Sequence, residues 1–135
     1  MQRCAVILFA HGSRDPLWSA PVRAIANRMQ QMSPALPVAC AYLEFMAPDL
    51  AQASDTLITA GANHLTVVPL FLGVGHHTRQ DLPRMVTMLR LQYPQAEFDL
   101  RPAVGEDPRV VALLAEIACG QIAAGRPPAG RGLGT

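Results

Sequence analysis

Apolar residues along the 135-residue chain gather in four runs, and stretches with helical spacing separate these runs. The runs cover residues 4–10, 38–45, 64–72 and 96–103. The first three are almost wholly apolar, and the first is also rich in β-branched side chains, a pattern typical of buried strands. Residues 19–32, 48–60, 81–93 and 106–122 repeat apolar side chains on one helical face. The chain therefore predicts a regular alternation of strand and helix.

Nearly all-apolar strands joined by helices predict an α/β fold, in which helices cover both faces of a parallel sheet. We expect one three-layer domain over residues 1–123, with a four-stranded parallel sheet in the order 2-1-3-4, because crossovers between parallel strands are right-handed. Residues 124–135, rich in glycine and proline, are expected to form a disordered tail.

Prolines, glycines and capping residues indicate where several elements begin and end. Ser19 is expected to cap the first helix, and Gly61 to end the second. Pro69 lies inside an apolar run and is expected to end regular strand pairing there. Asp81 is expected to cap the third helix, because Pro83 would then lie in the first turn, where a missing N–H costs nothing.

Composition and charge exclude some partners. The formal net charge is only +1, so no global field attracts nucleic acid or a membrane, and we expect neither as a partner. All 11 basic residues are arginine, which can bind carboxylates through two hydrogen bonds. The N-terminal apolar run is too short for a signal peptide or a membrane span, so we expect a cytoplasmic protein. Cys4, Cys40 and Cys119 lack the spacing of a metal site and are expected to be buried free thiols.

Polar side chains follow each expected strand, at the edge where open parallel sheets bind their ligands. They are His11, Ser13, Arg14 and Asp15 after the first run, Glu44 at the end of the second, His76, His77, Arg79 and Asp81 after the third, and Arg101, Glu106 and Asp107 after the fourth. The topology brings these residues to one edge. His64 precedes the third strand at the opposite edge, and we expect it to be an ordinary solvated or hydrogen-bonded histidine.

Three of these positions indicate chemistry. His11 is followed by a glycine that leaves room for a ligand, and Glu44 interrupts an apolar strand, where an unpaired carboxylate is costly. At least one of His76 and His77 is expected to point into the cleft. Neutral imidazoles and a carboxylate suit divalent cobalt, nickel, iron or zinc, and they accept protons near neutral pH. Metal insertion into a nitrogen macrocycle fits both properties, although metal-assisted hydrolysis would use the same ligands.

The segments LFAHGSRDP (8–16) and PLFLGVGHHTRQDLP (69–83) resemble the small CbiX-type class II chelatases. YLEFMAPDL (42–50) and RPAVGEDPRV (101–110) also resemble this family, and the resemblance extends from residue 4 to about residue 120. Its members are the short sirohydrochlorin cobaltochelatases of cobalamin biosynthesis, lyases related to the sirohydrochlorin ferrochelatases. The resemblance implies insertion of a divalent metal into sirohydrochlorin, with Co²⁺ as the first expectation and Fe²⁺ or Ni²⁺ as possible metals.

The resemblance also implies roles for individual residues. The first histidine of the family falls on His11, and the second, four residues before the aspartate of an H-x-x-x-D-[IL]-P pattern, falls on His77. The acidic residue falls on Glu44, so these three are the expected metal ligands, with the histidines also taking up protons. Arg14 and Arg79 are expected to anchor the tetrapyrrole carboxylates, or else to be ordinary surface charges.

Longer class II chelatases contain two such halves in one chain, whereas this sequence matches one half. The resemblance therefore implies a homodimer with the cleft between two copies. Two other functions use the same features. A non-catalytic carrier of metal or tetrapyrrole would need the same fold and ligands. A phosphate-handling hydrolase could use the HGSR loop, but that loop lacks a glycine-rich phosphate cradle leading directly into a helix.

Overall fold

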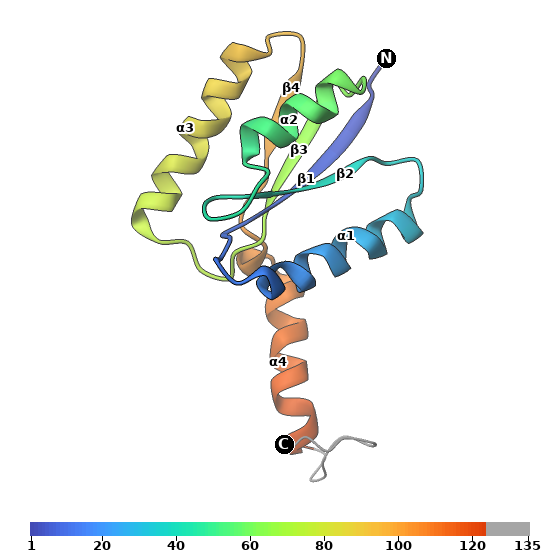
Figure 1. Ribbon diagram of the computed structural model, residues 1–135. Coiled ribbons are helices and arrows are strands. Elements are labelled where there is room, and N and C mark those ends of the chain that lie inside the picture. Colours follow the sequence, from blue (N-terminus) through green and yellow to red (C-terminus); the bar gives the residue numbers. More distant parts are fainter. Residues whose placement is uncertain (124–135) are drawn as a thin grey trace.

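Four parallel strands form the centre of the structure in the order β2-β1-β3-β4, which confirms the predicted sheet. The computed structural model describes residues 1–123, so the expected tail at 124–135 lies outside the described residues. The elements are β1 (Cys4–Ala10), η1 (Pro16–Ser19), α1 (Ala20–Met32), β2 (Val38–Tyr42), α2 (Leu50–Thr59), β3 (His64–Pro69), α3 (His76–Gln92), β4 (Glu97–Leu100), η2 (Val104–Glu106) and α4 (Pro108–Ala123) (Figure 1).

Strand β1 lies inside the sheet and is buried on both faces, which explains its continuous apolar run. Its residues alternate between the two faces, as the pleat of a strand requires. Ile7 and Phe9 are fully buried in the cluster that α2 and α3 complete. Leu8 points to the other face, where it packs in the cluster that contains Val22 of α1. Helices α2 and α3 therefore cover one face of the sheet, and α1 covers part of the other.

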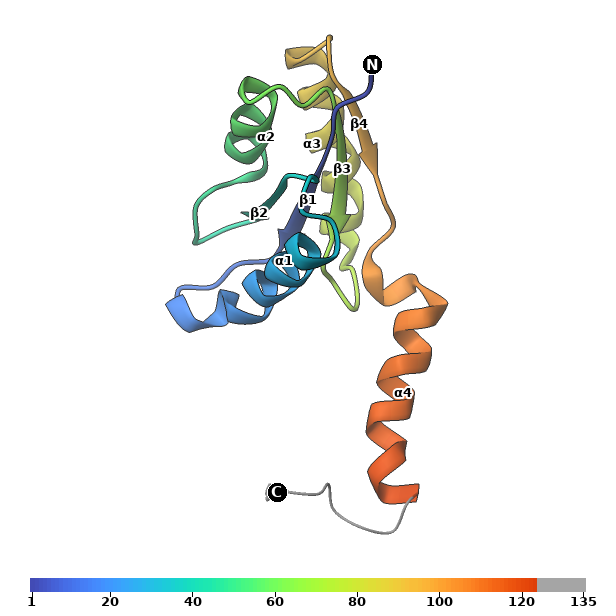
Figure 2. The same ribbon diagram turned by 90° about the vertical axis from the view of Figure 1, so that its right-hand side faces the viewer.

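Helix α4 stands apart from the rest of the domain. Figures 1 and 2 show it leaving the sheet at the end of η2 and pointing away from the body of the protein. Every position from 111 to 120 is exposed. The sheet face beside α1 offers α4 little apolar surface at β3 and β4, because residues there include Thr66, Asp99 and the ion pair of His64 with Glu97.

None of the helices in residues 1–123 has both the length and the apolar character needed to cross a bilayer.

Several predicted boundaries are confirmed. Gly61 adopts a φ of 112° directly after α2, which ends the helix as expected. Pro69 is the last residue of β3. Ser19 precedes α1 as predicted, but its hydroxyl makes no capping bond and donates instead to the Pro16 carbonyl. Strands β2 and β4 end earlier than predicted, at Tyr42 and Leu100.

The predicted start of the third helix is wrong. Helix α3 begins at His76 with Gly75 as its N-cap, and the first-turn Arg79 N–H donates to the Gly75 carbonyl at 2.9 Å. Asp81 therefore lies inside the helix, and Pro83 is an interior proline. The apolar pattern could not reveal this start, because the first turn is polar and carries no buried side chain. The two adjacent histidines are consequently helical residues.

The three cysteines are free thiols, as expected, but none is fully buried. Cys4 and Cys119 are exposed, whereas Cys40 is half-buried. Burial raises the pKa of the Cys40 thiol, although the nearby Arg23 cation acts in the opposite direction. The expectation of buried thiols is therefore wrong for Cys4 and Cys119.

We predict that Pro83→Ala stabilises the protein. An interior proline removes one helical hydrogen bond and crowds the preceding turn, at a cost of about 3 kcal/mol relative to alanine. The proline also restricts the unfolded chain, so the expected gain in the free energy of unfolding is about 1–2 kcal/mol. Urea unfolding followed by circular dichroism measures it. Asp81→Ala, on the exposed surface of the same helix, is the control and should change stability by less than about 0.5 kcal/mol. Unchanged or lower stability of the Pro83 variant would contradict the argument.

Candidate active site at the carboxyl edge of the sheet

His11 and Glu44 form a close pair where β1 and β2 end. The His11 Nε2 atom lies 2.8 Å from the Glu44 Oε2 atom. The backbone brings them together, because Leu43 N–H donates to the Ala10 carbonyl at 2.9 Å and Glu44 N–H donates to the His11 carbonyl at 3.1 Å. These two bonds extend the β1–β2 pairing past the ends of both strands. The predicted convergence of His11 and Glu44 at this edge is confirmed.

The 2.8 Å separation is that of a hydrogen bond. An ionised carboxylate only accepts hydrogen bonds, so Nε2 of His11 is the donor wherever Glu44 is ionised. The pair lies open to solvent, with side-chain exposures of 53% for His11 and 47% for Glu44. Protons and small ions from solution therefore have direct access to both atoms.

The predicted surroundings of Glu44 are wrong. The sequence places this carboxylate inside a buried strand, but β2 ends at Tyr42 and Glu44 lies in the bend that follows. The chain turns outward at Phe45, which adopts a φ of 69°, and the Ala47–Pro48 peptide bond is cis. Glu44 is thus an exposed carboxylate paired with His11. The need to neutralise a buried charge therefore does not explain this pairing.

Gly12 allows the two loops to approach each other. Its φ is 95°, and a Cβ atom at this position would lie 1.9 Å from the Glu44 carbonyl oxygen. No side chain fits in this space without moving the backbone of the Glu44 loop. The sequence suggested that this glycine leaves room for a ligand, whereas the structure uses it for contact between two loops.

His76 and His77 lie in the first turn of α3, and both are exposed. Their rings pack edge to face with centroids 5.8 Å apart. The His76 Nε2 atom also lies 3.3 Å from the Gln80 side-chain nitrogen, one helical turn further on. Within residues 1–123, His77 makes no side-chain hydrogen bond or ion pair, so its imidazole nitrogens are available to a ligand.

The structure does not bring His77 together with the His11–Glu44 pair. In the part of the chain that the structure describes, no group of three or more His, Cys, Asp or Glu side chains could hold one metal ion. The edge therefore offers a two-residue centre in the loops after β1 and β2 and a separate histidine pair on α3.

Two arginines and two small polar residues complete the first and third loops. The Arg14 guanidinium lies over the Phe45 ring, 4.7 Å from its centroid, and Arg79 donates to the Val74 carbonyl at 3.3 Å. Ser13 accepts from the Asp15 N–H, and Asp15 in turn accepts from Leu17 N–H and caps η1. Ser13 and Asp15 therefore shape the loop.

The polar residues after β4 make local structural contacts. Asp107 accepts hydrogen bonds from the backbone and the guanidinium of Arg109 at the start of α4. These bonds lower the pKa of the Asp107 carboxyl to about 2. Arg101 pairs with Asp99 at 3.7 Å, and Glu106 makes no ion pair in the described structure.

Exposed apolar side chains at this edge are a feature that the sequence did not predict. Leu17, Trp18, Phe45 and Leu72 are exposed, and they follow the carboxyl ends of β1, β2 and β3. Phe45 stands out because a positive φ is costly for an aromatic residue that is 55% exposed. In the sequence, the one sign of this group is that large apolar residues occur in segments expected to be loops. We call these four residues the apolar rim, because they lie at the carboxyl edge of the sheet, as the His11–Glu44 pair does.

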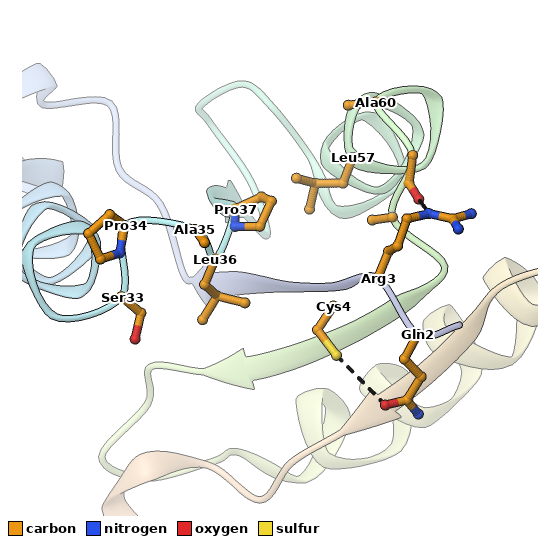
Figure 3. Close-up of a pocket in the computed structure, with 12 residues that line it drawn as sticks. Gln2, Arg3, Cys4, Ser33, Pro34, Ala35, Leu36, Pro37, Leu57 and Ala60 are labelled. Carbon is orange, nitrogen blue, oxygen red and sulfur yellow. Dashed lines mark hydrogen bonds between the residues drawn. The ribbon is translucent and has the colours of Figure 1, made fainter.

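A hollow lies at the opposite, amino edge of the sheet. It has a volume of about 730 Å³ and a mainly apolar lining that includes Leu36 and Leu57 (Figure 3). Arg3 donates to the Gly61 carbonyl there, and the Cys4 thiol faces Gln2. The lining contains no histidine or carboxylate, so this hollow lacks the metal-binding and proton-accepting side chains of the carboxyl edge.

We predict that Gly12→Ala destabilises the protein and separates His11 from Glu44. The added methyl group would clash with the Glu44 backbone, and alanine is strained at this positive φ. The free energy of unfolding should therefore fall by about 2–4 kcal/mol. Gly73→Ala is the matched control, because nothing lies within 4 Å of its added Cβ atom. Urea unfolding compares the two variants. Equal stability of both would contradict the proposed contact between the loops.

Comparisons with known proteins agree with this architecture. A sequence model of the CbiX family matches residues 5–119. A protein named sirohydrochlorin cobaltochelatase from Methanococcus aeolicus is 30% identical over 65% of this chain and 62% of its own length. The chain therefore spans less than two thirds of that relative.

Two solved structures share the fold. A cobalamin-biosynthesis CbiX protein from Marinobacter aquaeolei superposes with a TM-score of 0.78 at 28% identity, over 90% of this chain and 99% of its own. The sirohydrochlorin chelatase SirB from Bacillus subtilis subspecies spizizenii, solved with cobalt, gives a TM-score of 0.74 at 23% identity. The match covers 89% of this chain but only 51% of SirB. From the family match over 5–119 and the shared sheet topology, the chain belongs to the CbiX family.

Proposed function

We propose that this chain is a cytoplasmic chelatase that inserts a divalent metal, Co²⁺ first, into sirohydrochlorin. The observation that carries the proposal is the His11–Glu44 pair, open to solvent at the ligand-binding edge of the sheet. Membership of the CbiX family supports it, as does the relative named sirohydrochlorin cobaltochelatase. In this reaction the metal ion is a substrate, because the ion leaves in the product.

The geometry of the pair suits a divalent ion. Metal–nitrogen and metal–oxygen bonds are about 2.0–2.2 Å long, so two donors at a right angle around one ion lie roughly 3 Å apart. Nε2 of His11 and Oε2 of Glu44, at 2.8 Å, match that spacing. An incoming ion would replace the proton that the two atoms share. His77 is the proposed third ligand, although it lies outside this pair in the single chain.

The exchange of a proton for a metal ion at the His11–Glu44 pair links metal transfer to proton uptake. Insertion removes two protons from pyrrole nitrogens as the M²⁺ ion enters the ring. When the ion leaves the pair, Nε2 of His11 regains the ability to hold a proton against Glu44. We assign one of the two protons to this pair and the other to the imidazole of His77. Glu44 then orients His11 and balances the positive charge on the protonated ring.

A single chain supplies only one wall of the reaction site. The Bacillus subtilis chelatase is about twice as long as the region that this chain matches, so a second half is present in that protein. We propose that two copies of this chain form a homodimer that encloses the macrocycle between their carboxyl edges. A flat ring enclosed on both faces is held in one orientation and is shielded from water.

The proposed substrate contacts use the arginines and the apolar rim. Sirohydrochlorin carries carboxylates around a flat ring, so Arg14 and Arg79 are assigned to the carboxylates. Phe45 presents an exposed ring beside the pair, and the Arg14 guanidinium already lies above it. An exposed aromatic ring can stack against the macrocycle while the cation beside it binds a carboxylate.

The deciding experiment is an insertion assay with sirohydrochlorin and Co²⁺, Fe²⁺, Ni²⁺ or Zn²⁺. The absorbance of the macrocycle reports insertion, and the rate is compared with the rate without protein. Faster insertion of at least one metal supports the chelatase. Binding of both metal and macrocycle without any acceleration would indicate a carrier and would overturn the proposed function.

We predict that His11→Ala and His77→Ala each lower the rate of metal insertion by at least about 100-fold, because each removes a metal ligand and a proton acceptor. His76→Ala should cost less than about tenfold, since that ring already contacts Gln80. His64→Ala is the control, because His64 lies at the opposite edge of the sheet. Circular dichroism verifies folding of each variant. An inactive His76 variant beside an active His77 variant would contradict the assignment.

A further inference from the structure

Cys4, His64 and Glu97 lie side by side at the amino edge of the sheet. They are the first residues of β1, β3 and β4, and the strand register pairs Cys4 with His64 and His64 with Glu97. Paired residues on neighbouring parallel strands point to the same face, and the strands are about 4.8 Å apart. The three side chains therefore form a row that crosses three strands.

The row lies on the face of the sheet that α1 covers only in part. Two residues further along the strands, Val6 follows Cys4 in the cluster beneath α1, and Val68 belongs to the same cluster as a residue of even number on β3. Side chains alternate along a strand, so Cys4 and His64 point to this face as well. Cys4 is exposed, and the side chains of His64 and Glu97 are 24% and 70% exposed. A small molecule from solution can therefore reach the row.

The row places a nucleophile, a base and a carboxylate in that order. Nδ1 of His64 lies 3.3 Å from Oε2 of Glu97. When Glu97 is ionised and the imidazole is neutral, Nδ1 is the donor in this contact, so Nε2 carries the lone pair. A free imidazole nitrogen beside a thiol can accept its proton, and the thiolate that remains is the reactive form of cysteine.

Cys4 also lines the hollow at the amino edge, which gives its thiol room for a bound molecule of about 730 Å³ or less (Figure 3). The thiol makes only a long contact, 3.9 Å from the Gln2 side-chain oxygen. Arg3 lines the same hollow and donates from Nε to the Gly61 carbonyl. Within residues 1–123, its terminal guanidinium nitrogens make no hydrogen bond or ion pair. A cation that can bind a carboxylate therefore lies next to the thiol.

We propose that Cys4 is a site of thiol–disulfide exchange with small disulfides that carry carboxylates, and that His64 is its base. The thiol gives its proton to Nε2 of His64, and the Cys4 thiolate attacks one sulfur of the disulfide. A new S–S bond to Cys4 forms as the original S–S bond breaks, and the other half leaves as a thiolate that takes the proton from His64. Cys4 is oxidised and the leaving half is reduced, so the electrons balance.

Each neighbour of Cys4 has a separate part in this exchange. Glu97 orients the imidazole and balances its charge when the ring holds the proton. Arg3 binds a carboxylate of the incoming disulfide. The row lies at the edge opposite His11 and Glu44, so the exchange does not depend on the proposed metal insertion.

The test compares Cys4 with Cys119, which is also exposed but lies on a helix without histidine. The probe is dithiobis(nitrobenzoate), a disulfide with carboxylates whose released thiol is followed by absorbance. Cys119→Ser leaves Cys4 as the exposed thiol, and Cys4→Ser leaves Cys119. An ordinary thiol is only a few per cent ionised at about pH 7, so a base can raise its rate by up to roughly 30-fold. We expect Cys4 to react at least about 10-fold faster than Cys119.

A His64 variant distinguishes a base from a structural residue. In the Cys119→Ser background, His64→Gln should slow the reaction of Cys4 about tenfold at about pH 7. At about pH 10 the thiol is ionised without a base, so the same substitution should leave the rate unchanged. Arg3 and Glu97, the charged neighbours of the row, keep their charges over this range.

An Arg3 variant tests the preference for carboxylates. Arg3→Gln should slow the reaction of Cys4 with dithiobis(nitrobenzoate) and leave the rate with dithiodipyridine, a neutral disulfide, unchanged. Equal effects on both probes would overturn the assignment of the carboxylate to Arg3.

Three results would overturn the exchange site itself. They are equal rates for Cys4 and Cys119, an unchanged rate in His64→Gln at about pH 7, and an equal loss in His64→Gln at both pH values. The last result would mean that His64 only supports the structure around Cys4. Circular dichroism verifies the folding of each variant, and His64→Asn takes the place of His64→Gln if that variant is unfolded.

Discussion

The hydrogen bonds that continue the β1–β2 pairing beyond both strands are the constraint on which the site depends. They hold the loop after β1 against the loop after β2, so that the carbonyl groups of Ala10 and His11 accept from Leu43 and Glu44. This register places the two side chains close enough to share a proton. Gly12 makes the approach sterically possible. The backbone positions of the two residues are thus set by the sheet.

Much of the fold follows from the alternation of apolar runs and helical spacing. Strand β1 matches its expected bounds, since residues 5–10 are buried or half-buried and face both sides of the sheet. The start of α3 could not be predicted in the same way. Its first turn, from His76, is solvent-exposed, so no apolar periodicity marks it, and Pro83 favoured a later start. A buried helix face requires apolar residues at regular spacing, which can be recognised in the sequence, whereas an exposed turn requires no such spacing.

The site could be predicted only in part for a similar reason. The topology of a parallel sheet is enough to place His11 and Glu44 at one edge. The contact between Gly12 and the Glu44 carbonyl joins two loops that are distant in sequence, and no local pattern encodes it. The position of α4 was equally hidden, because an apolar stripe has the same spacing whether it packs on its own domain or on another chain. Sequence periodicity shows that a face must be covered and does not identify what covers it.

The exposure of the His11–Glu44 pair has a kinetic consequence. An ion held by a few protein donors at an open position keeps water in its remaining coordination sites, and water can displace it stepwise. Such an ion exchanges readily with its surroundings. A buried site with a full set of protein ligands would bind more tightly but release the ion slowly. For a protein proposed to give its metal away in every cycle, a short residence time is the useful property, and the half-exposed side chains of His11 and Glu44 are consistent with it.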